Sequence, residues 1–290
     1  MRVLLAIDGS PSSEAARRVV DAMAWPAATI IRVLGVVPPI SPRVAAFGVP
    51  LPEPPEGDQE SVFRATVHEA TVALQRPGRR IERIVMTGRP ASVIVDEAAA
   101  WGAELIVVGS RGLGRLGSMV LGSVSAEVVD HAPCPVLVTR SDAIRSILVA
   151  VDGSPSARQA VDHLALGYLK GRPAEVLAVG PTHPSEVQAD AIAAQAAEDL
   201  AADGYRVRWS VSRGDAAHEI VAAASALDAD LVVLGSRGLT GLARLRLGSV
   251  ARNVLLHTHS SVLIVRGPVR VRHAERLEDG ERIPAAAASH

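Results

Sequence analysis

The chain has 290 residues, 48% hydrophobic and 21% charged, so it can bury one large core or two of ordinary domain size and is not a disordered chain. A formal net charge of −1 gives no general attraction to nucleic acid or to an anionic membrane. No apolar run is long enough for a membrane span or a signal peptide. The single cysteine, Cys134, cannot form an internal disulfide, which is typical of a reducing compartment. We therefore expect a cytoplasmic protein.

Through the first half, short β-branched runs alternate with segments of helical period. The expected strands lie near residues 2–8, 29–36, 81–87, 104–109 and 135–140. The expected helices lie near residues 12–24, 59–76, 90–101 and 122–131. Seven prolines fall in residues 38–55, and this insert would form either a lid over a ligand site or a tolerated surface loop.

The second half has the same order of elements. Its expected strands lie near residues 145–151, 174–179, 206–212, 230–235 and 261–266. Its expected helices lie near residues 155–169, 184–203, 216–227 and 248–257. Such alternation predicts right-handed crossovers and an α/β fold of two tandem, doubly wound, open parallel five-stranded sheets. We place the first domain at residues 1–140, the second at 145–267 and a C-terminal tail at 268–290.

A glycine pattern occurs twice, 126 residues apart. The segments "GSRGLGRLGSMVLGS" at 109–123 and "GSRGLTGLARLRLGS" at 235–249 are identical at nine of fifteen positions. Each reads Gly, two residues, Gly, nine residues, Gly-Ser, and connects a predicted strand to a predicted helix; we call it the glycine frame. Flanking blocks also repeat, as in "AIDGS" and "AVDGS", so the chain is a tandem duplication.

The glycine frame has the features of a phosphate site. Glycine permits close approach of a backbone to a ligand, and a helix N-terminus offers N–H groups and a favourable dipole to an anion. Gly122 and Gly248 would bring the backbone to a phosphate, while Ser123 and Ser249 would donate hydroxyl groups. The turn would be shaped by Gly109, Gly112, Gly235 and Gly238, and phosphate charge would be neutralised by Arg111 and Arg237. Alternatively, these residues only end strands and cap helices, but two copies in one context favour a ligand site.

Two better-known phosphate motifs do not match. A Walker loop needs a lysine within the frame, and the only lysine in the chain is Lys170. A dinucleotide fingerprint places its glycines directly after the first strand, which here ends in "DGSPS".

Asp8 and Asp152 end the first strand of each half. If the first and fourth strands are neighbours, each aspartate faces the crevice that the glycine frame borders. A carboxylate there would bind a ribose, an adenine edge or a magnesium ion that bridges phosphates. The alternative is a turn aspartate that accepts a hydrogen bond from its own backbone; the neighbouring glycine frame favours the ligand.

Other reactive residue types form no convincing site. His257 and His259 lack the partners of a metal site, and Cys134, between two prolines, is expected to be a packed residue. Ser10 lies outside any Gly-x-Ser-x-Gly elbow. The arginines of residues 76–83 lack the interleaved aromatics of a nucleic-acid surface.

Taken together, "AIDGS", "AVDGS", both glycine frames and "HAPCPVLVTR" at 131–140 resemble the universal stress protein family, over nearly the whole chain and as a tandem pair. The resemblance implies strand order 3-2-1-4-5 and ATP binding wherever the frame is complete, hence two sites. It also implies that the halves pair through their fifth strands as a pseudo-dimer, and it leaves open a further homodimer and an unknown protein partner. The second half departs from the first at this edge, where it has "HTHSSVLIV" in place of "HAPCPVLV".

The resemblance assigns eight nucleotide-contacting residues to each half, with the valine of the second strand at the adenine. In the first half these are Asp8, Val36, Gly109, Arg111, Gly112, Gly122, Ser123 and Val124. In the second half these are Asp152, Val179, Gly235, Arg237, Gly238, Gly248, Ser249 and Val250.

Three functions are compatible with such sites. The leading prediction is an ATP-binding stress-response regulator in which nucleotide occupancy biases conformation or partner binding. The second is a slow ATPase or phosphate-transferring enzyme in which Asp8 and Asp152 help to hold magnesium, although the sequence shows no positioned base or nucleophile. The third is a scaffold that holds an adenylate for stability alone.

Overall fold

The computed structural model describes residues 1–39, 56–112, 121–180, 186–237 and 247–267. The strands of the first half are β1 (Arg2–Ile7), β2 (Ile30–Val37), β3 (Arg80–Thr87), β4 (Leu105–Gly109) and β5 (Val136–Thr139). Its helices are α1 (Pro11–Asp21), α2 (Glu56–Leu74), α3 (Pro90–Trp101) and α4 (Ser123–His131). Every element predicted here is present, with small shifts at the ends. Most of the proline-rich insert, residues 40–55, lies outside the described residues.

The second half repeats this order. Its strands are β6 (Ile147–Val151), β7 (Pro173–Gly180), β8 (Arg206–Arg213), β9 (Leu231–Gly235) and β10 (Ser261–Val265). Its helices are α5 (Pro155–Leu164), α6 (Glu186–Ala202), α7 (Ala216–Ala226) and α8 (Ser249–His257). The helix predicted at 155–169 is shorter, because Gly167 has a φ of +83° and the chain turns to bury Tyr168 and Leu169.

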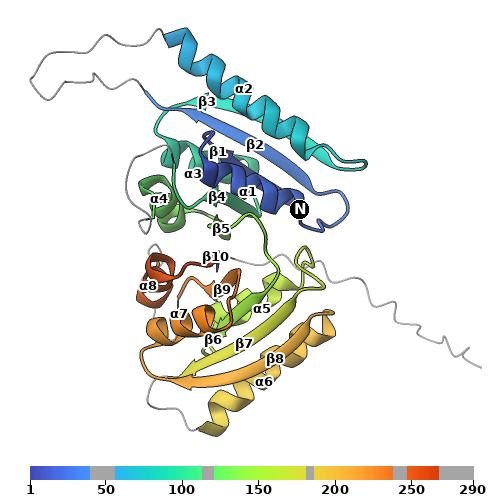
Figure 1. The fold of residues 1–290 in the computed structure, drawn as a ribbon, viewed down its shortest axis with the longest axis vertical. Helices are drawn as coiled ribbons and strands as arrows, with labels where there is room; N and C mark the ends of the chain where they lie inside the picture. Colours follow the sequence, from blue (N-terminus) through green and yellow to red (C-terminus); the bar gives the residue numbers. More distant parts are fainter. Residues whose placement is uncertain (40–55, 113–120, 181–185, 238–246, 268–290) are drawn as a thin grey trace, which may run out of the picture.

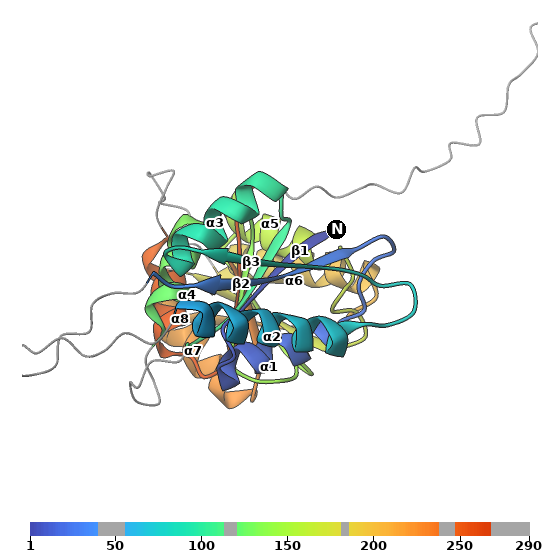
Figure 2. The ribbon, with the colours of Figure 1, turned by 90° about the horizontal axis from the view of Figure 1, so that it is seen from above.

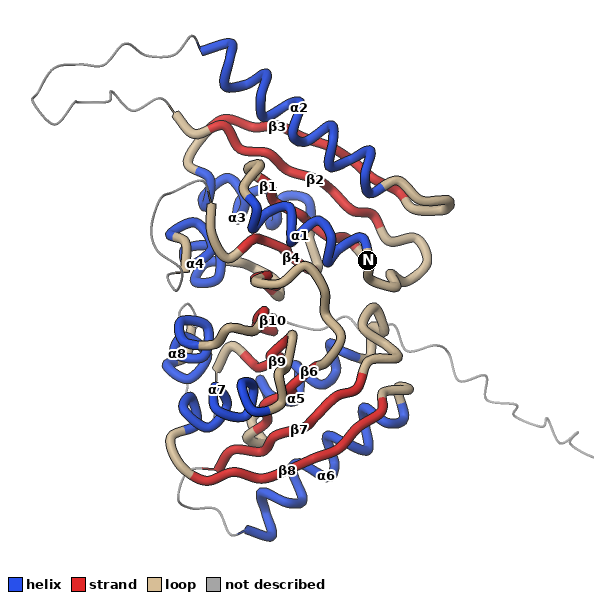
Figure 3. Tube along the Cα trace, in the orientation of Figure 1, coloured by secondary structure: helices blue, strands red, loops and turns tan. Residues whose placement is uncertain are grey.

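All ten strands form one continuous sheet of order β3-β2-β1-β4-β5-β10-β9-β6-β7-β8. Each half therefore has the order 3-2-1-4-5, and its strands pair in parallel. The halves meet where β5 and β10 pair antiparallel, in the middle of the molecule (Figure 1). Figure 3 shows the strands as one layer that passes through both halves between the helices.

Two apolar cores cover the two faces of the sheet. One lies against α1, α2, α5 and α6, and the other against α3, α4, α7 and α8. Around β2 and β3, α1 and α2 lie on one side and α3 on the other (Figure 2). Along β1, Val3 and Leu5 enter the first core and Leu4 the second, since successive side chains of a strand point to opposite faces. This explains the apolar runs: a parallel strand covered on both sides has no solvent face.

Two arginines reach across the line where the halves meet. Arg140, after β5, donates from Nη2 to the carbonyl of Leu255 near the end of α8, at 2.6 Å. In return, Nη1 of Arg266, after β10, donates to the carbonyls of Asp130 and Ala132 at the end of α4, at 3.2 Å. The last carbonyls of a helix accept no hydrogen bond within that helix. Each half therefore supplies an arginine donor to the end of a helix in the other half.

The halves also contact each other through aromatic rings. Trp25, which follows α1, stacks on Tyr168 of the second half with ring centroids 5.1 Å apart. His163, on α5, meets the same tyrosine edge to face at 5.7 Å. Tyr168 and His163 are almost completely buried, so this contact belongs to the core rather than to a loose interface.

Candidate functional site

The candidate site of the first half is a pocket at the carboxyl ends of β1 and β4. These strands are neighbours, with Val3 beside Leu105, and their connections leave to opposite faces of the sheet. This is the position at which doubly wound sheets bind ligands. The pocket is lined by Ala6, Ile7, Asp8, Ser13, Leu34, Val36, Pro38, Phe63, Pro90, Ile94, Val108, Gly109, Arg111, Gly112, Val124 and Ser125.

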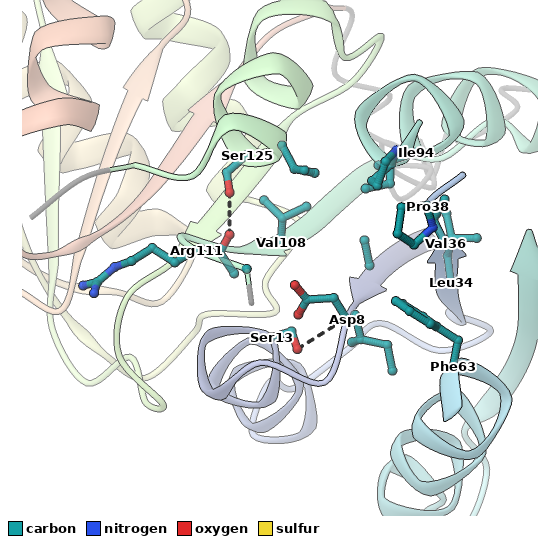
Figure 4. A pocket seen from close by; sticks show the side chains of 16 residues that line it. Asp8, Ser13, Leu34, Val36, Pro38, Phe63, Ile94, Val108, Arg111 and Ser125 are labelled. Carbon is teal, nitrogen blue, oxygen red and sulfur yellow. Dashed lines mark hydrogen bonds between the residues drawn. The ribbon is translucent and has the colours of Figure 1, made fainter. Parts of the chain in front are cut away.

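One part of the pocket is apolar. Leu34 and Val36 come from β2, Phe63 from α2, Ile94 from α3 and Val108 from β4. In Figure 4 the Phe63 ring reaches from its helix toward the strand ends, with Leu34, Val36 and Pro38 near it. An apolar slot with a few polar groups at one end is the usual form of a small-molecule site.

Asp8 supplies the carboxylate of the pocket. Its Oδ1 accepts a hydrogen bond from the N–H of Ser10 at 3.0 Å, which is the turn interaction that the alternative interpretation predicts. Its Oδ2 borders the glycine frame, since a Cβ added to Gly112 would lie 2.7 Å from this oxygen. Asp8 therefore stabilises the turn and also lines the pocket. In the second half, Oδ1 of Asp152 accepts the equivalent bond from Ser154 at 2.9 Å.

The first glycine of each frame lies against the start of a helix. A Cβ at Gly109 would lie 2.6 Å from the carbonyl carbon of Ser12, and one at Gly235 would lie 2.5 Å from that of Ser156. Only glycine lets β4 and α1 approach so closely. Ser12 also accepts the N–H of Arg111 on its Oγ at 3.1 Å, which fixes the chain as it leaves the strand.

The last glycine of each frame caps the next helix. The N–H of Gly122 donates to the carbonyl of Ser110 at 2.8 Å, and Gly248 donates to Ser236 at the same distance. The first bond within α4 runs from Ala126 to Gly122, so the amides of the first helical turn have no acceptor inside the helix. These amides, which include that of Val124, are the donors that an anion would meet.

Arg111 lines the pocket, but its guanidinium does not face Asp8. It extends away from Asp8 and from the apolar side chains (Figure 4). By sheet register, Ser110 lies beside Arg140, since Gly109 pairs with Thr139. Burial, and then the positive charge of Arg111, lower the pKa of Arg140 to about 10. The charge of Arg111 thus acts on Arg140, which donates to the end of α8 in the other half.

Most of the predicted residues of the first half converge at the pocket. Those that line it are Asp8, Val36, Gly109, Arg111, Gly112 and Val124. Gly122 and Ser123 stand beside it at the start of α4. In the second half the equivalent residues occupy the same places. Val179 lies at the carboxyl end of β7, Gly235 ends β9 and Arg237 follows it, and Gly248, Ser249 and Val250 lie at the start of α8. Gly238 and the middle of both frames lie outside the described residues.

Sequence reasoning missed several lining residues. It also missed Ser12, which does not line the pocket but contacts Gly109 and accepts the Arg111 amide. Ser12 had a signal, because "DGSPS" is repeated in both halves and ends in Ser12 and Ser156. The lining residues Phe63, Pro90 and Ile94 had no signal in the sequence, because a helical residue that faces a pocket has the same spacing as one that faces the core.

Other reactive groups do not add to the site. Within the described part of the chain, no cluster of three or more His, Cys, Asp or Glu side chains could hold a metal ion. Cys134 is buried, and burial raises the pKa of its thiol to about 12, which removes the thiolate a nucleophile needs. Among the helices of the described residues, none has the length and apolarity to span a bilayer.

Fold and pocket together define a class: a duplicated Rossmann-like α/β protein with a glycine frame at the switch point of each half and a pocket beside the frame of the first half. The model of the universal stress protein family matches residues 1–140 and 143–266. The chain belongs to this family, as a tandem member.

Two curated relatives match this chain over nearly their whole length, and a third matches about half of it. A universal stress protein of Mycolicibacterium smegmatis is 27% identical over 292 residues, which covers 91% of this chain and 96% of that protein. One from Mycobacterium tuberculosis is 28% identical over 295 residues, with the same coverage. A single-domain relative from Thermus aquaticus is 36% identical over 138 residues, which covers 48% of this chain and 97% of that protein.

Solved structures support the fold. A universal stress protein from Archaeoglobus fulgidus superposes with a TM-score of 0.67 at 21% identity and covers 91% of this chain and 98% of that one. A protein from Pseudomonas aeruginosa, described as a putative universal stress protein, gives 0.62 at 20% identity, with 91% and 92% covered.

Proposed function

We propose that each half binds ATP in the crevice between β1 and β4, or between β6 and β9, and that nucleotide occupancy regulates a cytoplasmic stress response. The observation that carries the proposal is the pocket of the first half, where an apolar slot, Asp8 and the start of α4 converge on one cavity. The shared contacts of Gly109 and Gly235, and of Gly122 and Gly248, extend the proposal to the second half.

The pocket residues fit such a nucleotide. Adenine would lie in the apolar slot near Val36, or Val179 in the second half, and the phosphates at the amides that begin α4 and α8. Side chains at Gly109 or Gly112 would fill space that the ligand and the turn require. Mg²⁺ carried by ATP would neutralise phosphate charge, and Asp8 and Asp152 are the carboxylates that would help to hold it.

A regulator is favoured over an enzyme by the polar groups of the pocket. Among the lining residues that the structure describes, Asp8 is the only carboxylate, and one of its oxygens already accepts the Ser10 amide. This described lining also contains no histidine or cysteine that would provide a base or nucleophile. Release of phosphate from saturating ATP and magnesium, at a rate that Asp8→Asn lowers and Asp8→Asn together with Asp152→Asn abolishes, would instead favour the slow ATPase.

Nucleotide content tests the proposal directly. We would purify the chain without added nucleotide, denature it and separate the supernatant by anion exchange, beside Gly122→Asp, Gly248→Asp and the double variant. We expect close to two adenine nucleotides per chain, one in each single variant and none in the double variant, because a carboxylate at the helix start repels phosphate. Gly78→Asp adds the same charge at a remote turn and should retain both.

The opposite result is equally clear. A chain that releases no nucleotide and does not bind added ATP would leave the glycine frames as structural turns and the protein as a scaffold. A change in self-association or in capture of a protein partner between ATP-loaded and ATP-free chains would separate the regulator from a module that holds adenylate for stability alone.

A further inference from the structure

The two halves differ in the apolar slot of the proposed nucleotide site. Sheet register makes Gly35 and Ala178 equivalent, since Ile7 lies beside Gly35 and Val151 lies beside Ala178. Thr66 and Ile192 are also equivalent, because they are the neighbours that a Cβ at Gly9 and at Gly153 would meet. Three residues before them, the first half has Phe63 and the second half has Ala189.

The absence of a side chain at Gly35 makes room for Phe63. A Cβ at Gly35 would lie 2.6 Å from Cγ2 of Val67 and 3.5 Å from Cδ1 of Phe63. The missing side chain on β2 thus leaves the space in which α2 approaches the strand and sets the Phe63 ring at the pocket wall. The second half has alanine at the positions of Gly35, Phe63 and Val67, namely Ala178, Ala189 and Ala193.

The alanines of the second half give a wall of different chemistry. Ala178, Ala189 and Ala193 are all buried, so methyl groups fill this part of the core, and none of the three positions supplies an aromatic ring to the slot. In the first half Phe63 is only half-buried and belongs to the pocket lining. On the strand beside this wall the slot residues are the same in both halves, since Leu34 and Val36 correspond to Leu177 and Val179.

We propose that the two sites are not equivalent, and that Phe63 is a base-contacting residue which makes the first site the tighter one for adenine nucleotides. This inference rests on the proposed function. An aromatic ring offers a purine a flat, desolvated contact surface, and removal of one such contact typically weakens binding roughly tenfold. At ligand concentrations between the two dissociation constants, the chain holds one nucleotide, in its first half.

The test uses chains with one functional site each. Gly248→Asp leaves the first site and Gly122→Asp leaves the second, and both are titrated with ATP by calorimetry after removal of bound nucleotide. We expect the first site to bind roughly tenfold more tightly. Phe63→Ala should remove most of this difference in the Gly248→Asp chain and leave the affinity of the Gly122→Asp chain unchanged. Phe63→Leu should restore part of it.

Two further measurements separate base contact from a folding defect. Inorganic tripolyphosphate, which has no base, should bind the first site equally with and without Phe63→Ala. The pair Ala178→Gly and Ala189→Phe should tighten ATP binding at the second site. Equal ATP affinities at both sites that do not respond to Phe63→Ala, or a parallel loss of tripolyphosphate binding, would overturn this inference while leaving the proposed function intact. Absence of ATP binding by the unsubstituted chain would overturn the proposed function itself.

Discussion

At the scale of single residues, the glycines of one frame have different structural roles. Gly109 is buried against the backbone of Ser12, so its missing side chain is a packing requirement. Gly112 is exposed, and its nearest neighbour is the carboxylate of Asp8, which can rotate. The same residue type therefore serves the fold at one position and the site at another.

Alanine at these two glycines should separate stability from binding. Gly109→Ala, like Gly235→Ala, pushes a helix away from its strand, and we expect the free energy of unfolding to fall by about 1–3 kcal/mol in urea denaturation. Gly112→Ala should leave that free energy within about 0.5 kcal/mol, because the residue is exposed. It should nevertheless weaken ATP binding in a Gly248→Asp chain, because it displaces the Asp8 carboxylate. The reverse pattern would show that Gly112 is the structural glycine.

At the scale of elements, α3 and α7 occupy equivalent places but begin differently. The residue before each helix has nearly the same backbone angles, φ −70° and ψ 117° at Arg89 and φ −68° and ψ 117° at Asp215. Asp215 caps α7 by accepting the N–H of His218, at 2.9 Å. Arg89 makes no such bond, and its ion pair with Glu127 is long and exposed. α3 therefore begins without the side-chain cap that its counterpart α7 has.

Substitutions at these two N-cap positions should change the free energy of unfolding in opposite directions. Arg89→Asp should raise the free energy of unfolding by about 1 kcal/mol, since an N-cap oxygen satisfies an amide of the first turn and an exposed ion pair contributes little. Asp215→Ala should lower it by about 1 kcal/mol, and Asp215→Asn, which keeps the acceptor, should change it by only a few tenths. Urea denaturation of the three variants measures the differences. A neutral Arg89→Asp would mean that α3 receives its cap elsewhere.

At the scale of the whole molecule, the two halves share one sheet, and the aromatic contact of Trp25 with Tyr168 joins them a second time. His163 is enclosed beside this contact, and its Nε2 has no hydrogen-bond partner among the described residues. Burial lowers the pKa of His163 to about 4. A group that must stay neutral in the folded state makes stability depend on pH.

The sign of that dependence follows from proton uptake. Between an unfolded pKa of about 6.5 and the folded value, the unfolded chain binds a proton at His163 that the folded chain does not, so stability falls as pH falls. We expect a loss of at most about 1.4 kcal/mol per pH unit, present at pH 5–6.5 and absent above pH 7. His163→Phe, which keeps a ring against Tyr168, should remove this slope in urea denaturation, and the exposed His131→Gln should not. An unchanged slope in His163→Phe would place the pH dependence elsewhere.

Much of the fold could be predicted from sequence because its signals are local. Buried parallel strands are continuous apolar runs, Ser10 and Ser154 cap α1 and α5 through the predicted "DGSPS" turns, and the repeated blocks determine that one unit occurs twice. The end of α5 was misplaced because Gly167 ends the periodic region only through its left-handed conformation, and a sequence pattern does not reveal the conformation that a glycine adopts.

What the sequence determined by itself was the order of elements, the duplication and the glycine positions, since each depends on neighbours along the chain. The tertiary structure alone decided which side chains meet across it. Arg140 lies 115 residues from its acceptor Leu255, and Phe63 reaches the pocket because Gly35 lets its helix approach. Such contacts depend on packing between elements, and a single sequence records the residues but not the distance between them.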